Sequence, residues 1–430
     1  MDVLNRIISG LLETLPGSPH QSSLQAVPID KIEIDQATLN IERKERSNLF
    51  PWSGQFSPQL IEALLHRYAP RGGVVLDPFA GSGTVLAECG RERLEAIAVE
   101  INPAACCMAR TYELINCERP ERVRWIWEVG HTLREKLSVE YPLFDRESPP
   151  VSPVSAIEQL RALSVAIQGE GPRRLFEALV VLLDLYRPGL ERTRLMSTWN
   201  RLVGTIQRLP FSDRPLTVIN ADARQIPIAS QSVDLVITSP PYINVFNYHQ
   251  QYRSSAEFLG WDLLAVAKSE IGSNRKNRAN RFLTVVQYCL DIYRAFEELR
   301  RVCKESAQVI FVVGRQSNVR KTPFQNGELV AAVATKCAAF LLRTRQERAF
   351  TNKFGDRIFE DILHFTIGPL GASQQEAPAG IAVAALEQAL PLAPPEALRD
   401  LEAAIAHASW VECSPLYHHR QGQKCQSKED

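Results

Sequence analysis

The segment at residues 72–103 constrains the fold most, because it predicts a strand, a glycine-rich turn, a helix and a second strand in succession. Residues 74–76 are a short apolar run typical of a buried strand, and the helix is expected from about Thr84. The second strand ends at Glu100. Parallel strands joined by a helix need helices on both faces of their sheet. We therefore expect an α/β fold with a mostly parallel, twisted sheet.

The turn in this unit has the sequence DPFAGSGT (residues 77–84) and is suited to hold a cofactor. Gly81 and Gly83 lack a Cβ atom, so the chain can turn tightly and approach a ligand closely. The amide groups at the start of the next helix then face the polar end of the ligand. Glu100, at the end of the second strand, can accept hydrogen bonds from both hydroxyls of a ribose. NAD and ATP are disfavoured, because the turn contains neither GxGxxG nor GKS/GKT.

A second motif, TSPPY (residues 238–242), follows another predicted strand. Pro240 and Pro241 lack backbone N–H groups, while their carbonyls remain available as acceptors. Ser239 adds a further acceptor, and Tyr242 adds a flat aromatic face. An acceptor pair beside an aromatic ring suits a planar substrate that carries an amino group.

Together, DPFAGSGT and TSPPY resemble the motifs of class I DNA amino-methyltransferases, which use S-adenosyl-L-methionine (SAM) to methylate cytosine N4 or adenine N6. The resemblance covers about residues 50–111 and 216–368. It implies a Rossmann-like fold, SAM as the cofactor and double-stranded DNA as the substrate. It also implies a role in restriction–modification or self-protection, in which a cognate restriction endonuclease can be a partner.

The resemblance further assigns roles to cofactor-binding residues. It implies that Asp77 contacts the methionine ammonium directly or through water, that Glu100 holds the ribose and that Asp222 lies beside the adenine amino group. The segment FPWSGQFSPQLI (residues 50–61) looks like the one that closes over the methionine end of SAM. The expected cofactor site comprises Phe56, Ser57, Asp77, Pro78, Phe79, Gly81, Gly83, Thr84, Glu100 and Asp222.

The reaction that the resemblance implies uses Ser239, Pro240, Pro241 and Tyr242. The target amine donates its hydrogens to Ser239 and to the Pro240 carbonyl, which directs its lone pair at the SAM methyl group. A base in a duplex must first be flipped out, and Tyr242 is expected to stack on it. Serine at position 239 resembles the cytosine-N4 form of the motif, whereas adenine-N6 enzymes usually have Asp or Asn there. The glycine turn precedes TSPPY, which reverses the commonest cytosine-N4 order.

The sequence leaves alternatives open. Some adenine-N6 DNA methyltransferases also carry the serine form of the motif. RNA guanine-N2 and protein glutamine methyltransferases have similar Pro-Pro-Tyr turns, usually with Asp or Asn in place of Ser239. The intact TSPPY motif disfavours a non-catalytic SAM-binding or DNA-binding module. A cytosine-C5 enzyme is disfavoured, because its nucleophilic cysteine typically lies in a Pro-Cys pair and this chain has none.

The charge of the chain is balanced, with 49 basic and 49 acidic residues. DNA binding therefore requires a local concentration of positive charge. The best cluster lies in the loop at residues 269–282 and consists of Arg275, Lys276, Arg278 and Arg281. We expect these side chains to contact DNA phosphates.

The nine cysteines include no CxxC pair, so we expect no structural zinc and no other metal. Their odd number and irregular spacing fit reduced thiols in the cytoplasm. No apolar run is long enough to span a membrane, and the N-terminus lacks the features of a signal peptide. We therefore expect a cytoplasmic protein that does not enter a membrane.

The composition divides the chain into five expected regions. These are an N-terminal extension (1–48), a SAM-binding half (49–112), a helical insertion suited to target recognition (113–210), a catalytic half (211–368) and a partly disordered C-terminal tail (369–430). Within the catalytic half, one helix is expected over residues 327–342 and a late strand over 359–368. One short helix is expected in the tail, near 395–407.

Overall fold

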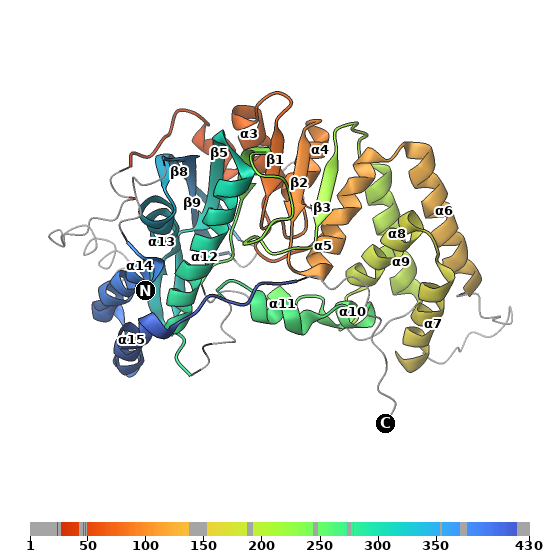
Figure 1. Ribbon diagram of the computed structural model, residues 1–430. Coiled ribbons are helices and arrows are strands. Elements are labelled where there is room, and N and C mark those ends of the chain that lie inside the picture. The colour runs from red at the N-terminus through yellow and green to blue at the C-terminus, as the bar shows by residue number, and fades with distance from the viewer. Residues whose placement is uncertain are drawn as a thin grey trace.

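The computed structural model describes residues 24, 27–42, 46, 48, 50–136, 153–186, 192–243, 248–272, 277, 279–352, 355–369 and 376–418. Its centre is a seven-stranded sheet with the order β3-β2-β1-β4-β5-β9-β8 (Figure 1). Its strands are β1 (Val74–Asp77), β2 (Glu95–Val99), β3 (Leu216–Ile219), β4 (Val233–Thr238), β5 (Cys303–Gly314), β8 (Phe340–Thr351) and β9 (Arg357–Ile367). Only the β9 pairs in this sheet are antiparallel. The expected α/β fold with a mostly parallel sheet is confirmed.

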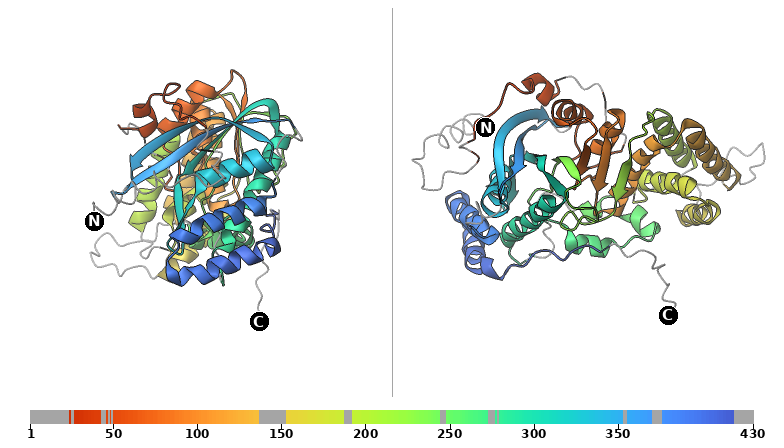
Figure 2. Two further views of the ribbon diagram at one scale, coloured as in Figure 1. Left: turned by 90° about the vertical axis from the view of Figure 1, so that its left-hand side faces the viewer. Right: turned by 45° about the horizontal axis from the view of Figure 1, so that its top comes forward.

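The two faces of the sheet are covered by different helices, because side chains alternate between the faces along each strand. In β5, Ile310 and Val312 belong to the core on one face, whereas Phe311 and Val313 belong to the core on the other. The first face is covered by α3 (Pro58–Tyr68), α4 (Thr84–Arg91) and α5 (Pro103–Arg110), and the second by α12 (Leu283–Val302) and α13 (Asn326–Ala332). Figure 2 shows α12 and the sheet from two further directions.

A group of four helices lies beside β3 at one end of the sheet (Figure 1). The chain enters it through a 3-10 helix, η1 (Thr111–Asn116). The four helices are α6 (Arg119–Lys136), α7 (Pro153–Ala166), α8 (Glu170–Leu183) and α9 (Arg192–Gln207). Helix α8 buries Leu175, Leu179 and Leu183, and it packs against α5, α6 and α9. The apolar residues at helical spacing in this part of the sequence therefore lie in helices.

The prediction of a single helix over residues 327–342 is wrong. Helix α13 ends at Ala332 and is followed by a π-helical turn, η3 (Val333–Cys337). Ala339 then adopts a positive φ of 57°, and β8 starts at Phe340. The sequence CAAFLL is equally apolar in a helix or a strand, and the pairing of β8 with β9 decides between them. The strand at the predicted position, β9, is present.

In its described part, residues 376–418, the C-terminal region holds two α-helices where one was expected. Helix α15 (Pro395–His407) matches the expected helix, and α14 (Pro378–Ala389) is additional. Helix α14 is rich in alanine, which favours helix formation, and its small residues let it pack closely on α12. The region from 376 to 418 is therefore part of the folded domain, and the expected disorder of the last residues lies outside the described residues.

The shorter elements are α2 (Gln36–Asn40), η2 (Tyr248–Gln250), α10 (Arg253–Phe258), α11 (Leu263–Ser269), the hairpin β6 (Gln316–Val319) and β7 (Thr322–Gln325), η4 (Leu390–Leu392) and η5 (Ala408–Trp410). Across the described part of the chain, no helix combines the length and the apolar character that crossing a membrane requires.

Candidate active site

The glycine turn and the TSPPY turn line one pocket at the carboxyl edge of the sheet. β1 and β4 are neighbouring parallel strands, and each turn directly follows one of them. Gly81, Ser239 and Pro241 line this pocket. Of the other expected cofactor residues, Phe56, Pro78, Phe79, Thr84, Glu100 and Asp222 line it as well. Two motifs that are distant in the sequence therefore face a common cavity.

Both glycines of the turn are required by its geometry. Gly81 and Gly83 have φ angles of 51° and 87°, which residues with a Cβ atom rarely adopt. A Cβ at Gly83 would lie 2.8 Å from Ala109, so this glycine also lets α4 approach α5. A Cβ at Gly81 would lie 3.0 Å from the Trp52 ring, which covers the turn. Gly81 therefore forms a wall of the pocket, while Gly83 supports the turn from below.

Two buried carboxyl groups lie at the ends of β1 and β2. Glu100 accepts hydrogen bonds from the N–H groups of Gly81 (2.8 Å) and Asn102 (2.7 Å). Asp77 accepts hydrogen bonds from the Thr238 hydroxyl (2.6 Å) and the Phe79 N–H (3.1 Å). Burial raises the pKa of each carboxyl group to about 7. Glu100 lines the pocket, whereas Asp77 lies beneath the turn and links the strands that carry the two motifs.

The segment that precedes α3 is tied to the glycine turn by side-chain hydrogen bonds. The Thr84 hydroxyl donates to Asn48 Oδ1 (3.0 Å), and the Ser82 hydroxyl donates to Gln55 Oε1 (3.0 Å). Ser57 occupies the N-cap position of α3, with Pro58 at the first helical position. Ser57 itself lines a neighbouring groove, and its buried Oγ has no hydrogen-bond partner among the described residues.

Asp222 lines the pocket, but its carboxylate is held by other protein groups. Arg224 donates to both of its oxygens, from Nε to Oδ1 (2.9 Å) and from Nη2 to Oδ2 (2.7 Å). The N–H of Tyr417 also donates to Oδ2 (3.0 Å). Arg224 in turn donates to Asp291 and to the carbonyls of Ser269, Ser414 and Pro415. Asp222 thus anchors the C-terminal segment, and its role toward an adenine ring stays a prediction.

In the TSPPY turn, the last residue contacts the second. Ser239 Oγ and the Tyr242 hydroxyl lie 3.3 Å apart. The Tyr242 ring packs against Gly314 at the end of β5, where a Cβ atom would lie 2.8 Å from the ring. Ser239 and Pro241 line the pocket, whereas Pro240 is buried and Tyr242 lines neither the pocket nor the neighbouring groove. The stacking role of Tyr242 therefore stays a prediction, and the structure shows a different contact for its ring.

A larger groove, with a volume of about 860 Å³, adjoins the pocket at Ser239. Gln55, Phe56 and Ser239 line both cavities. The far side of the groove comes from the β8–β9 hairpin, which contributes Arg348, Phe350, Arg357 and Glu360. A ligand in the pocket and a second molecule in the groove could therefore meet at Ser239.

Several residues outside the expected cofactor and catalytic sets also line these cavities. Trp52 and Tyr248 line the pocket with their rings stacked at a centroid distance of 6.0 Å. Trp52 belongs to the segment at residues 50–61 that resembles the one closing over SAM, and Tyr248 follows the TSPPY turn by six positions. Glu270 also lines the pocket and holds the buried His249 ring at 2.7 Å. Arg348 carried no signal, because β8 was not predicted. Glu360 lies in the predicted strand β9, but its position beside Arg348 depends on the pairing with β8.

The expected phosphate-binding loop is described only in part. Arg275, Lys276 and Arg278 lie outside the described residues, and Arg281 lies two positions before α12. The contact of these side chains with DNA phosphates stays a prediction.

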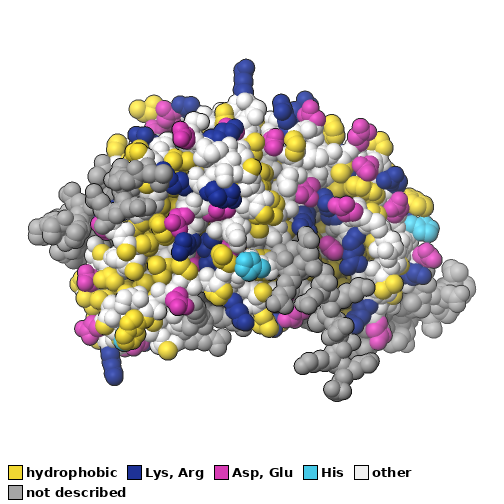
Figure 3. Space-filling model, viewed as in Figure 1, with side chains coloured by type: hydrophobic (Ala, Val, Ile, Leu, Met, Phe, Trp, Pro, Cys, Tyr) yellow, Lys and Arg dark blue, Asp and Glu magenta, His cyan; other side chains and the backbone are white. Residues whose placement is uncertain are grey.

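On the face shown in Figure 3, Lys and Arg side chains are interspersed with Asp and Glu side chains, in agreement with the balanced composition.

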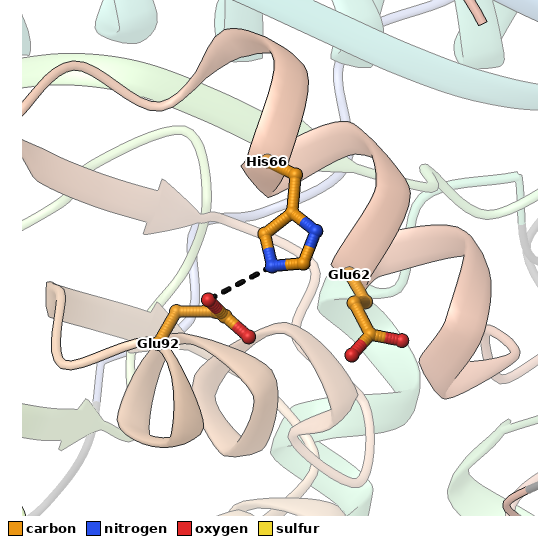
Figure 4. Close-up of side chains that lie close together, drawn as sticks. All are labelled: Glu62, His66 and Glu92. Atoms are coloured by element: carbon orange, nitrogen blue, oxygen red, sulfur yellow. Dashed lines mark ion pairs between the residues drawn. The ribbon is translucent and has the colours of Figure 1, made fainter.

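Among the described residues, one group of side chains has the composition of a metal site. Glu62, His66 and Glu92 offer ligand atoms within 4.8 Å of one another (Figure 4). His66 Nε2 pairs with Glu92 at 2.9 Å, and Arg46 pairs with Glu62 at 2.6 Å. The group joins α3 to the end of α4 that lies away from the glycine turn. These ion pairs explain why the three side chains lie together, and we assign no bound metal to them.

Residues 29–111, which include the glycine turn, match the DNA methylase family model N6_N4_Mtase. The chain is similar to the Type II methyltransferase M.MjaII of Methanocaldococcus jannaschii, with 36% identity over 83 residues, or 18% of this chain and 16% of that protein. It is also similar to the Type II methyltransferase M.XycI of Xanthomonas campestris pv. cyanopsidis, with 38% identity over 66 residues, or 14% and 22% of the two chains. The alignments thus span less than a quarter of either relative.

Solved structures give weaker similarities. A SAM-dependent methyltransferase from Methanosarcina mazei is 12% identical, with a TM-score of 0.32, over 71% of this chain and 97% of that one. The PH0226 protein from Pyrococcus horikoshii OT3 is 11% identical, also with a TM-score of 0.32, over 71% and 87% of the two chains.

Proposed function

We propose that the protein transfers a methyl group from SAM to the exocyclic amine of a flipped DNA base, and that this amine is cytosine N4. The observation that carries the proposal is the position of Ser239, which lines both the pocket behind the glycine turn and the groove beside it. The match of residues 29–111 to the DNA methylase family and the similarity to two Type II methyltransferases support a methyltransferase of the DNA amino type. A partner restriction endonuclease is part of this proposal.

The residues of the pocket fit SAM. Gly81 leaves room for a ligand against the turn, and Glu100 presents a carboxyl group that can accept from ribose hydroxyls. Phe79, Trp52 and Tyr248 supply apolar surface for a flat ring. SAM bound here supplies an electrophilic methyl group on a sulfonium. The carboxyl group of Asp77 lies under the turn and, in its charged form, would favour a ligand ammonium nearby.

The TSPPY turn binds the amine that accepts the methyl group. The two amine hydrogens donate to Ser239 Oγ and to the Pro240 carbonyl, which leaves the nitrogen lone pair facing the pocket. A bond then forms between this nitrogen and the methyl carbon as the bond from that carbon to sulfur breaks. The nitrogen becomes positively charged and releases one proton to solvent. Ser239 and Pro240 contribute by orienting the amine and by stabilising its developing charge.

A transfer assay tests the proposal. The purified protein is incubated with SAM labelled on its methyl group and, in separate reactions, with duplex DNA, tRNA or a protein mixture. The DNA is then digested, and the modified nucleoside is identified by mass spectrometry. We expect N4-methylcytosine in DNA. Label on RNA or protein alone would reject a DNA substrate, and N6-methyladenine would reject cytosine.

The variant Ser239→Ala ties the activity to the site. We expect it to lower turnover about tenfold or more while SAM affinity stays unchanged, because the hydroxyl contacts the amine and not the donor. Ser230→Ala is the matched control, because Ser230 is exposed and contacts Arg301 away from the pocket. Equal turnover of the wild type and Ser239→Ala would remove Ser239 from the mechanism.

A further inference from the structure

Arg348 and Glu360 face each other across the β8–β9 hairpin and line the groove that begins at Ser239. They lie beyond both sequence motifs. The inference drawn from them rests on the proposed function and names the groups that recognise the base.

The Arg348 guanidinium is buried without full hydrogen bonding. Its side chain is 5% exposed, and its Nε has no hydrogen-bond partner among the described residues. Glu360 Oε2 lies 3.4 Å from Nε, and the guanidinium carbon lies 4.6 Å from the centre of the Phe350 ring. A buried charged donor without a partner is costly, so such groups usually meet a ligand or water. Nε is enclosed beside Glu360, whereas Nη1 and Nη2 make no hydrogen bond to a described residue, so these terminal donors are available to a molecule in the groove.

A line of polar contacts connects Arg348 to the TSPPY turn. Glu360 pairs with Arg348 and interacts with the Tyr242 side chain, and the Tyr242 hydroxyl lies 3.3 Å from Ser239 Oγ. An amine bound at Ser239 would thus have the rest of its ring in the groove toward Arg348. The groups next to that amine on the ring are the ones that Arg348 could reach.

We propose that Arg348 recognises the target base by donating hydrogen bonds to N3 and O2 of cytosine. These two acceptors follow the N4 amine along the Watson–Crick edge, and the guanidinium offers two adjacent donors in one plane. Adenine presents a single acceptor, N1, followed by a C–H group beside its amine. One adenine acceptor cannot satisfy both donors, so Arg348 selects cytosine. Glu360 and Phe350 hold the guanidinium in place.

The alternative is that Arg348 and Glu360 form only a structural ion pair between two strands. A base analogue separates the two explanations. The methylated cytosine is first located by sequencing modified DNA, and an oligonucleotide is then made with 3-deazacytosine at that position. This analogue keeps the amine and O2 but replaces the N3 acceptor with a C–H group. The kcat/KM of methylation is measured on both substrates.

Three variants are compared with the wild type. Arg348→Gln removes the guanidinium, and Arg348→Lys keeps the charge beside Glu360 but loses the paired donors. Arg343→Gln is the control, because Arg343 is exposed near the start of β8 and donates to Thr366. Thermal unfolding of each variant identifies any that fail to fold. If Arg348→Gln does not fold, the test uses Arg348→Lys alone.

For the wild type and Arg343→Gln, we expect the analogue to lower kcat/KM by roughly 10- to 100-fold. For both Arg348 variants, kcat/KM on cytosine should fall by a comparable factor. Their kcat/KM values on cytosine and on the analogue should differ little. Folded Arg348 variants that keep the wild-type discrimination would overturn the inference. Wild-type production of N6-methyladenine would overturn it too, while leaving methyl transfer to DNA intact. No methylation of any DNA would reject the proposed function itself.

Discussion

Ser239 Oγ lies 3.3 Å from the Tyr242 hydroxyl, so the TSPPY turn is closed by a contact between its own side chains. The Tyr242 ring is fixed in turn by its packing against Gly314. This arrangement gives Tyr242 a positioning role toward Ser239. It differs from stacking on a base, and variants of Tyr242 can separate the two.

Tyr242→Phe should lower kcat for methyl transfer about 2- to 10-fold without changing SAM affinity. The change removes the hydrogen bond between the Tyr242 hydroxyl and Ser239, which contributes about 0.5–1.5 kcal/mol, and leaves the ring in place. Steady-state kinetics and calorimetric titration of SAM measure the two effects. Tyr242→Ala provides the comparison. If the ring stacks on the base and does nothing else, Tyr242→Phe will match the wild type and Tyr242→Ala will raise KM for DNA.

Gly314→Ala should destabilise the protein by about 1–3 kcal/mol, because the new methyl group would lie 2.8 Å from the Tyr242 ring. Urea unfolding monitored by circular dichroism measures the change. Gly380→Ala is the matched control, since Gly380 lies in α14 and a Cβ atom there would meet nothing within 4 Å. The control should leave stability unchanged or raise it slightly. Equal stability of Gly314→Ala and the wild type would show that Tyr242 moves freely.

Much of the fold can be predicted from the sequence, because local signals and tertiary structure agree there. The apolar run before Asp77, the helix from Thr84 and the strand ending before Glu100 all lie where the pattern places them. The common pocket also follows, since turns after neighbouring parallel strands meet at one edge of the sheet.

The remaining parts of the fold and of the candidate site depend on strand pairing and on long-range contacts that a single sequence does not reveal. Strand β8 carries several arginines and lacks clear alternation, so only its pairing with β9 defines it. Because β8 was missed, Arg348 and the groove were missed with it. Likewise, nothing near Asp222 in the sequence indicates that the distant Tyr417 donates to its carboxylate.

The cofactor-free protein should lose stability as pH rises from about 5 to 7. Burial raises the pKa of Glu100 from 4.5 to about 7, so the folded state keeps a proton that the unfolded chain releases in this range. The folded state binds more protons there, and its stability falls with rising pH by up to about 3 kcal/mol from this group. Asp77 acts in the same direction.

Glu100→Gln should therefore show a smaller loss of stability over this range. Urea unfolding at pH 5.0 and 7.5 gives the difference for each protein. Asp77 still titrates in the variant. The free energy of unfolding should therefore still fall with rising pH, but less steeply than in the wild type. An identical pH dependence in both proteins would show that Glu100 is ionised at pH 5 in the folded state.

Asp222→Asn should lower the free energy of unfolding by about 2–5 kcal/mol, because it leaves the buried Arg224 with one carboxylate partner, Asp291. Asp213→Asn, at an exposed position before β3, is the control and should behave like the wild type. Urea unfolding and SAM titration are measured on the same samples. Wild-type stability combined with weakened SAM binding would show that Asp222 serves the cofactor and not the C-terminal segment.

The methyl donor and the amine-binding turn must share one pocket for the proposed transfer to occur. A crystal structure of the protein with S-adenosylhomocysteine tests this requirement most directly. We expect the ribose on Glu100, the ligand against Gly81 and the sulfur facing Ser239. A nucleoside bound elsewhere, or a sulfur directed away from Ser239, would refute the shared pocket.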